Sequence, residues 1–336
     1  MLKIINAEQL KIPDSPQRWL EQLDTSTIIE FKGQNSSEWR VLSVLIHGNE
    51  PSGFFAVFEF LKNQLRPTVN LAIIISSVRA ARHPPYFTHR FVPGEFDLNR
   101  RFGVSLTSEK VHDGVTELAT EIIHYIQSKS PSLIVDLHNT SGNGPEFAVS
   151  VSDDLSIKQL ASVFTKTMVI THLVVGSLME QNFNCPIVTI ECGGAQNSRS
   201  HKIAYQGLVD FAQMESMPVL DEPIFETYYH PFRIEARSGV SLDYGEYHNR
   251  DVDITLRQDI ERFNFTEIEA GTELGWINRT LTDCIQAKSE SGEDVVNSLF
   301  SVKDLKIIAK RPMKLFMATC RADIAVSDCL FYSVNL

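Results

Sequence analysis

The 336-residue sequence contains few cysteines, no long apolar run and no excess of basic residues. Its five cysteines are odd in number and lack the CxxC spacing of a metal or redox site, so we expect buried, reduced thiols. No segment approaches the roughly 18 consecutive apolar residues of a membrane helix, and the amino terminus has no apolar signal core. A net charge of −11 and a pI of about 5.4 disfavour nucleic-acid and anionic-membrane partners. These absences favour a cytoplasmic protein, and they leave formation of a homo-oligomer open.

The chain also lacks GxGxxG and Walker patterns, so nucleotide binding has no support. What it contains is enough apolar sequence for a core, with 43% hydrophobic and 22% charged residues. Its length exceeds that of most single domains. Over residues 1–222 apolar strands alternate with amphipathic helices, which predicts an α/β domain with a doubly wound, mixed sheet flanked by helices. Over residues 223–336 short alternating stretches separated by turn residues predict a smaller β-rich module.

The first segment with candidate metal ligands is Val41–Gly53, which reads VLSVLIHGNEPSG. Five of its first six residues are apolar, which predicts a strand that is buried on both faces and ends at His47. An imidazole and a carboxylate three residues apart, His47 and Glu50, can bind one Zn²⁺ if the backbone turns tightly, and Gly48 would allow that turn. An HxxE pair alone often occurs by chance, so this interpretation depends on a third ligand.

A third ligand is available in the segment Pro131–Thr140, which reads PSLIVDLHNT. It predicts another short apolar strand, whose end presents Asp136 and His138. Because ligands gather at the carboxyl ends of the strands in an α/β sheet, His138 can join His47 and Glu50. A His, Glu, His set with an open fourth position is typical of catalytic zinc, since structural zinc is usually enclosed by cysteines. Asp136 is a candidate acceptor that would orient an imidazole.

Two further segments place polar residues beside predicted strands. The residues of Arg79–Gly94 have no sustained periodicity and predict a long irregular loop, which leads into the motif FDLNRRF. In that motif Asn99 and Arg100 can form a clamp for a carboxylate, although two consecutive arginines are also typical of a solvated turn. A later apolar strand ends in Glu191. A carboxylate at such a position is more often functional than structural, because an unpaired buried charge is costly.

With HGNEPSG, FDLNRRF, VDLHNT and IECGG in this order, the chain resembles the succinylglutamate desuccinylase/aspartoacylase family of zinc hydrolases. That family is a branch of the zinc carboxypeptidase-like fold. The resemblance covers roughly residues 40–200 strongly, and the C-terminal module only in its general layout. It implies one zinc ion per chain, with His47, Glu50 and His138 as ligands. It also implies that Glu191 is the general base, which takes a proton from the attacking water and later protonates the leaving amine.

The same resemblance assigns the groups that would contact substrate. Asn99 and Arg100 match the carboxylate clamp of the family. Arg90 lies near the position of an arginine that polarises the scissile carbonyl, and Arg82 is the alternative if the alignment shifts across a short insertion at Pro93-Gly94.

The chain departs from the family pattern where an acidic substrate would be recognised. Aspartoacylases have an arginine upstream of the base, whereas this chain has Gln181 there. We therefore expect neutral N-acyl amino acids to be preferred, unless Arg199 or Arg237 replaces the missing charge. The C-terminal module of the family also supplies a tyrosine, for which Tyr244 and Tyr332 are unmatched candidates.

The expected function is that of a zinc-dependent hydrolase that cleaves the amide bond of an N-acyl amino acid. Because the clamp could equally hold the terminal carboxylate of a peptide, a metallocarboxypeptidase acting on a short peptide or cell-wall fragment is the alternative. A metal-binding protein without catalysis is a third interpretation. It is disfavoured because the ligands, the base and the clamp are all present.

Overall fold

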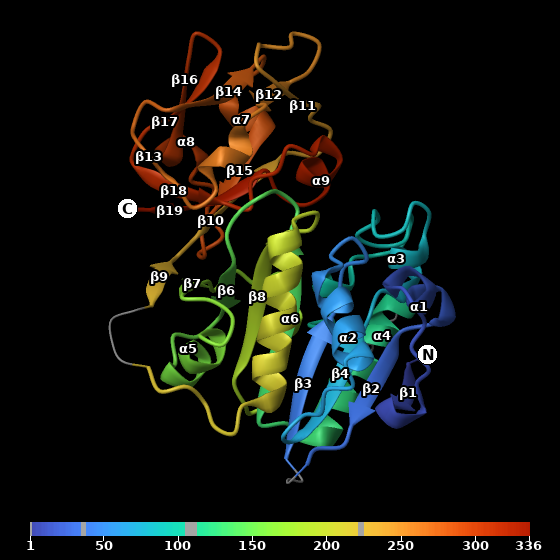
Figure 1. The fold of residues 1–336 in the computed structure, drawn as a ribbon. Coiled ribbons are helices and arrows are strands. Elements are labelled where there is room, and N and C mark those ends of the chain that lie inside the picture. The colour runs from blue at the N-terminus through green and yellow to red at the C-terminus, as the bar shows by residue number, and fades with distance from the viewer. Residues whose placement is uncertain (1, 35–37, 105–112, 221–224) are drawn as a thin grey trace. The chain divides into compact units, whose positions relative to one another are not determined.

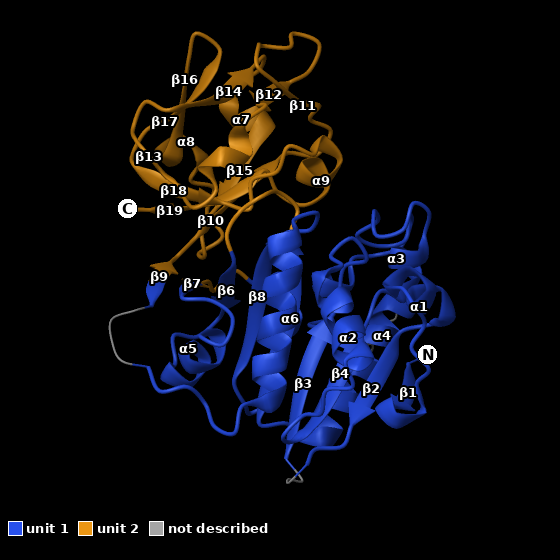
Figure 2. Ribbon diagram, in the orientation of Figure 1, with its two compact units in different colours: residues 1–139, 146–168, 174–226 blue, residues 140–145, 169–173, 227–336 orange. Residues whose placement is uncertain are grey.

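The computed structural model describes residues 2–34, 38–104, 113–220 and 225–336, and they form two compact units (Figure 2). Unit 1 comprises residues 1–139, 146–168 and 174–226. Unit 2 comprises residues 140–145, 169–173 and 227–336. The boundary predicted between residues 222 and 223 lies outside the described residues.

A nine-stranded mixed sheet is the central element of the fold (Figure 1). The strands in their order across the sheet are β1 (Lys3–Asn6), β2 (Thr27–Phe31), β4 (Asn70–Ile75), β3 (Trp39–Val44), β5 (Leu133–Thr140), β8 (Ile187–Gly194), β6 (Phe147–Ser150), β7 (Thr167–Ile170) and β9 (Glu226–Tyr229). β3 is parallel to both β4 and β5, whereas β2 is antiparallel to β4 and β6 is antiparallel to β8. The expected α/β architecture with a mixed sheet is confirmed.

Helices cover both faces of this sheet. They are α1 (Pro16–Gln22), α2 (Ser52–Lys62), α3 (Val78–Arg82), α4 (Gly114–Lys129), α5 (Leu155–Ala161) and α6 (Ser198–Gln213), with short 3-10 turns η1 (Ala7–Gln9), η2 (Leu98–Arg100) and η3 (Leu178–Glu180). α2 and α6 pack side by side over one face (Figure 1). α4 begins at Gly114, and residues 105–112 before it lie outside the described part of the chain.

The two faces of β3 explain why most of its residues are apolar. Val41 belongs to an apolar cluster that includes Ile122 and Ile126 of α4. Val44, three positions further on, lies against Gly53 of α2. Because successive side chains of a strand point to opposite faces, both faces of β3 are buried. A Cβ atom at Gly53 would lie 2.8 Å from a methyl carbon of Val44, so glycine permits this close approach of α2 to the sheet.

Unit 2 is rich in β-structure, as its alternating sequence predicts. One five-stranded sheet has the order β13 (Glu267–Ile268), β18 (Met313–Phe316), β19 (Phe331–Asn335), β10 (Phe232–Ala236) and β15 (Ile285–Lys288). The other has the order β11 (Leu242–Gly245), β12 (Ile254–Arg257), β14 (Glu273–Ile277), β17 (Lys306–Ala309) and β16 (Phe300–Lys303). The helices are α7 (Leu281–Cys284), α8 (Val296–Leu299) and α9 (Ala322–Ser327), with a 3-10 turn η4 (Ile260–Phe263). Both sheets contribute to one apolar core.

Among the described residues, no helix has both the length and the hydropathy needed to cross a lipid bilayer.

Candidate metal centre

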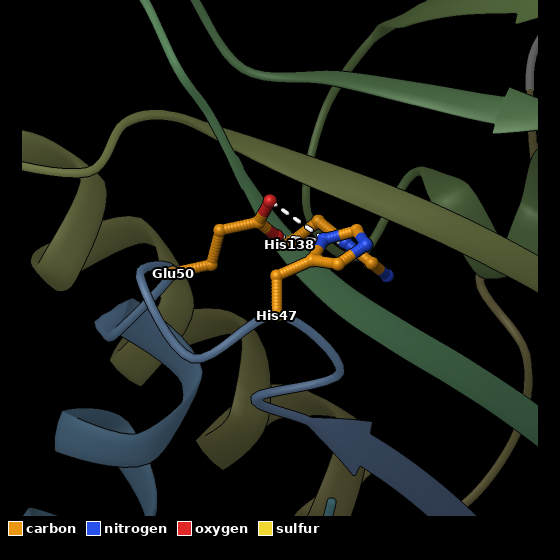
Figure 3. Close-up of side chains that lie close together, drawn as sticks. All are labelled: His47, Glu50 and His138. Carbon is orange, nitrogen blue, oxygen red and sulfur yellow. Dashed lines mark hydrogen bonds and ion pairs between the residues drawn. The ribbon is translucent and has the colours of Figure 1, made fainter. Parts of the chain in front are cut away.

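The side chains of His47, Glu50 and His138 converge in unit 1 (Figure 3). One ligand atom from each lies within 4.8 Å of those of the other two. Nδ1 of His47 is 2.7 Å from Oε1 of Glu50, and Nδ1 of His138 is 2.8 Å from Oε2 of the same carboxylate. All three residues are buried, with exposed fractions of 3%, 5% and 3%. The structure therefore brings together the three residues that the sequence predicted as metal ligands.

A tight turn after β3 presents His47 and Glu50. Leu45 has a φ of 57°, in the left-handed region, and the Glu50 N–H donates to the carbonyl of His47 at 3.2 Å. Gly48 does not have a positive φ. The turn therefore does not depend on the backbone freedom that we expected this glycine to provide. A Cβ atom at Gly48 would instead lie 2.5 Å from the backbone nitrogen of Ala81, at the end of a short helix in the segment expected to be irregular. Gly48 thus permits close contact with α3.

His138 lies inside β5 rather than beyond its end, because this strand continues to Thr140. Asp136 and His138, two positions apart, share a face of the strand, and Nε2 of His138 is 2.7 Å from Oδ2 of Asp136. Glu191 likewise lies inside a strand, β8, which continues to Gly194. A carboxylate on one imidazole nitrogen fixes the orientation of the ring and leaves the other nitrogen for a metal ion.

Asp97 has the corresponding position beside His47. Its Oδ1 is 3.2 Å from Nε2 of His47, and its Oδ2 accepts a 2.9 Å hydrogen bond from Nε of Arg90. Burial alone would raise the pKa of Asp97, but His47 and Arg90 outweigh it and hold the pKa well below its ordinary value. The role of Asp97 was not predicted from the sequence. The available signal was a carboxylate in the FDLNRRF motif, since a metal-binding histidine almost always has such an acceptor.

Electrostatic interactions between the three predicted ligands are strong. Burial would raise the pKa of Glu50, but the two facing imidazoles outweigh it and lower that pKa. Burial would lower the pKa of His138, but Asp136 and Glu50 outweigh it and raise that pKa well above its ordinary value. In both cases opposite charges at hydrogen-bond distance determine the result.

Glu191 is the fourth carboxylate of the centre. It is 7% exposed, and its Oε2 has no hydrogen-bond partner among the described residues. Burial is the largest cause of a rise in its pKa to about 7, with an added contribution from Glu50 that His138 opposes. A carboxylate with this pKa can both accept and donate a proton near neutral pH.

The donor set fits a zinc ion. Two Nδ1 atoms and one carboxylate face one another, and a further carboxylate lies on the opposite nitrogen of each ring. Four buried or largely buried carboxylates surround this point, those of Glu50, Asp97, Asp136 and Glu191. Arg90 approaches two of them, and the charge of Arg100 also acts on Asp97. A divalent cation would balance this excess of negative charge.

Hydrogen bonds anchor the Glu50 turn to the neighbouring elements. Asn139 donates from its backbone N–H to Oε2 of Glu50 at 3.2 Å and from Nδ2 to the carbonyl of Gly193 at 2.9 Å. Its Oδ1 accepts from the backbone N–H of Ser52 at 3.0 Å, and Oγ of Ser52 lies 2.7 Å from Nδ1 of His201. The predictions from sequence did not include this network, which joins β5, β8, α2 and α6.

The predicted clamp residues lie in η2, directly after Asp97. Asn99 is buried, and its Oδ1 accepts a 3.1 Å hydrogen bond from the backbone N–H of Leu178 at the start of η3. Arg100 donates to the carbonyl of Asn99 at 3.0 Å, and its charge contributes to the lowered pKa of Asp97. Both residues thus follow closely on Asp97, the carboxylate beside His47, and the backbone N–H of Asn99 donates to it at 2.8 Å.

Two alternatives left open by the sequence concern an arginine and a tyrosine. Arg90 approaches the centre, because its Nη1 lies 3.5 Å from the carboxylate of Glu50. Arg82 instead donates to the carbonyl of Leu23 at 2.7 Å. Tyr244, which packs against the core of unit 2, lies in β11, and Tyr332 lies in β19.

We expect Asp97→Ala to weaken zinc affinity about 10- to 100-fold, because His47 would lose the carboxylate that orients its ring. Competition with a chromophoric chelator measures this affinity. Glu95→Ala is the matched control, since Glu95 lies in the same segment and pairs with Arg79. Equal zinc affinity in the Asp97 variant and the wild type would contradict the orienting role.

No family sequence model and no curated protein sequence matches the chain, but solved structures match its fold. Succinylglutamate desuccinylase from Vibrio parahaemolyticus is similar over 92% of this chain and 85% of its own, with 16% identity and a TM-score of 0.58. A succinylglutamate desuccinylase/aspartoacylase from Rhodobacter sphaeroides is similar over 88% and 84%, with 15% identity and a TM-score of 0.55. Murine aminoacylase 3 is similar over 90% and 96%, with 14% identity and a TM-score of 0.53.

These similarities extend across both units of the chain and along most of each compared structure. They show that the chain has the desuccinylase/aspartoacylase fold. The fold expected from the four sequence motifs is thereby confirmed.

Proposed function

We propose that this protein is a zinc-dependent hydrolase of the succinylglutamate desuccinylase/aspartoacylase type, which cleaves the amide bond of an N-acyl amino acid. The observation that supports it most strongly is the buried group of His47, Glu50 and His138 beside Glu191. Each of the two histidines has its second ring nitrogen on a carboxylate, as is usual for metal-binding imidazoles. Structures of the same fold carry the names of two kinds of amide-cleaving enzyme, a desuccinylase and an aminoacylase.

The proposed ligands are His47, Glu50 and His138, with the ring orientations held by Asp97 and Asp136. When bound there, zinc supplies a Lewis acid that polarises a carbonyl and makes a water molecule more acidic.

Glu191 moves the protons of the reaction. Its Oε2 accepts one proton from the attacking water as the oxygen–carbon bond forms. The same carboxyl group then donates this proton to the nitrogen of the leaving amine as the carbon–nitrogen bond breaks. A pKa of about 7, raised chiefly by burial, suits both steps.

The cationic residues bind and orient the substrate. Arg90 lies beside Glu50 and Asp97, so its guanidinium can stabilise negative charge that develops on the carbonyl oxygen. Asn99 and Arg100 would hold the free carboxylate of the amino acid, because a guanidinium binds a carboxylate through two parallel hydrogen bonds. One clamp of this kind matches a substrate with one free carboxylate.

We expect neutral N-acyl amino acids to be preferred over N-acetylaspartate and N-succinylglutamate by about 10²-fold or more, the effect of one missing guanidinium on a buried carboxylate. Gln181 directly follows η3, the turn whose first residue, Leu178, donates its N–H to the clamp residue Asn99. Arg199 forms two hydrogen bonds with Glu146 in unit 1. Arg237, in unit 2, is hydrogen-bonded to Asp294 and to Gln286. Both candidate replacements are therefore engaged elsewhere.

The values of kcat/KM for N-acetylaspartate and a neutral N-acetyl amino acid test this preference. Gln181→Arg should shift the ratio toward N-acetylaspartate, whereas Gln159→Arg on α5 should not. A clear preference of the wild type for N-acetylaspartate would reveal a second cation at the site and would contradict the prediction.

A panel of N-acyl amino acids and short peptides, with detection of the released amine, tests the reaction itself. Release of free amino acid from the N-acyl substrates is the expected result. Turnover confined to the C-terminal residue of peptides would favour the metallocarboxypeptidase alternative.

A further inference from the structure

Unit 2 contains a second group of metal-binding side chains, formed by His172, His230 and Glu290. One ligand atom from each lies within 4.8 Å of those of the other two. The three residues come from separate segments: His172 follows β7, His230 lies between β9 and β10, and Glu290 follows β15. We propose that they form a second binding site for a divalent transition-metal ion, with Zn²⁺ as its probe. The proposal does not rest on the proposed hydrolytic function.

Both imidazoles face the same carboxylate. Nδ1 of His230 is 2.7 Å from Oε2 of Glu290, and Nδ1 of His172 is 3.5 Å from Oε1. The two rings are inclined by 27°, with their centroids 6.4 Å apart. An ion pair with one protonated histidine would explain one of these contacts. Two Nδ1 atoms and a carboxylate at one point form the same donor set as the buried centre.

The backbone holds these side chains in place. The N–H of His172 donates to Oε1 of Glu290 at 2.8 Å, which fixes the carboxylate against the chain. His230 has a φ of 56°, a conformation that is uncommon for residues other than glycine, and its N–H donates to the carbonyl of Ile170 at 3.3 Å. Gly292, with a φ of 81°, donates to the carbonyl of Ser289 and closes the turn that carries Glu290. The site is therefore organised before an ion arrives.

The exposure of the ligands indicates how tightly an ion would be held, and their donor atoms indicate which ions would bind. The side chains of His172 and His230 are 58% and 71% exposed, whereas that of Glu290 is 18% exposed. An ion would enter freely and would keep water in its remaining positions, so its binding should be weaker and more readily reversed than at the buried centre. Two imidazoles and one carboxylate suit Zn²⁺, Ni²⁺ or Cu²⁺ better than Ca²⁺ or Mg²⁺, which prefer oxygen ligands.

An ion at this site would link three segments of unit 2, and a ligand that binds only the folded state stabilises it. Zinc in excess of that needed by the buried centre should therefore raise the Tm of the wild-type protein. It should raise it less in variants that lack a surface ligand.

The experiment is a titration of metal-free, full-length protein with Zn²⁺ by calorimetry, at about one pH unit above the ordinary histidine pKa of roughly 6.5. The wild type should bind two ions with separate affinities. His230→Ala and Glu290→Gln should each lose the weaker ion and retain the tighter one. His124→Ala, an exposed histidine of α4, and Glu293→Gln, in the same turn as Glu290, are matched controls that should bind both ions.

A further variant distinguishes the ion of the buried centre from the ion of this surface site. His47→Ala should lose the tighter ion and still bind the weaker one, which would hold even if no amide were hydrolysed. Binding of a single ion by the wild type would overturn the proposal if His230→Ala and Glu290→Gln both retain that ion. So would retention of the weaker ion by both His230→Ala and Glu290→Gln. If His47→Ala does not fold, as judged by circular dichroism, the comparison of the wild type with the two surface variants decides the matter.

Discussion

Glu191→Gln should lower kcat for amide hydrolysis by about 10²- to 10⁴-fold, the usual contribution of a general acid–base. The amide of glutamine has the shape of the carboxylate, but it cannot accept the proton of water or return it to the amine. Since Glu191 does not belong to the group of three converging ligand atoms, we expect zinc affinity to stay within a few-fold of that of the wild type.

Single-turnover and steady-state rates on a neutral N-acetyl amino acid measure this effect, with zinc content determined on the same samples. Glu30→Gln is a suitable control, because Glu30 is a partly buried carboxylate on β2 that pairs with Lys129 and Tyr125. A wild-type kcat in Glu191→Gln, with zinc bound, would show that another group moves the protons.

His138→Ala should abolish zinc binding at the buried centre and hydrolysis with it. Its imidazole lies between two buried carboxylates, at 2.8 Å from Glu50 and 2.7 Å from Asp136. Removing one partner of a buried ion pair costs about 3–5 kcal/mol, because the other charge remains buried and unpaired. We therefore expect a lower free energy of unfolding as well as the loss of zinc.

Circular dichroism must first establish that this variant is folded, and Asp136→Asn offers a milder change. There the imidazole remains and loses only its charged acceptor, so zinc affinity should fall about 10- to 100-fold. His124→Ala, which removes an exposed imidazole from α4, should keep the affinity of the buried centre unchanged. Normal zinc content and turnover in His138→Ala would mean that the ligand set is different.

The three converging ligands could be predicted because each interrupts or follows an apolar strand. A charged or metal-binding residue stands out in such a run, as His47 does after β3 and as His138 and Glu191 do within β5 and β8. The strand positions also imply convergence, since the carboxyl ends of neighbouring strands lie at one edge of the sheet.

Other parts of the site depend on contacts between distant segments. Asp97 lies in a stretch without periodicity, and only the folded chain brings it to His47. The turn after β3 uses a left-handed Leu45, which no sequence rule favours, while Gly48 serves a contact with α3. β1 was not predicted, because Lys3–Asn6 is a short edge strand whose one neighbour among the described strands is β2.

The surface group in unit 2 has no signal in the sequence. His172, His230 and Glu290 are isolated residues without the spacing of a metal motif, and each lies in a connection between elements. They meet because three connections of unit 2 come together.

The most direct test of the proposed function is to follow hydrolysis of a neutral N-acetyl amino acid while zinc is removed and restored. Turnover should fall to background as a strong chelator removes the ion of the buried centre, and it should return on addition of one equivalent of Zn²⁺ to the metal-free protein. Hydrolysis that persists at its original rate after the protein has been shown to be free of metal would contradict zinc-dependent catalysis.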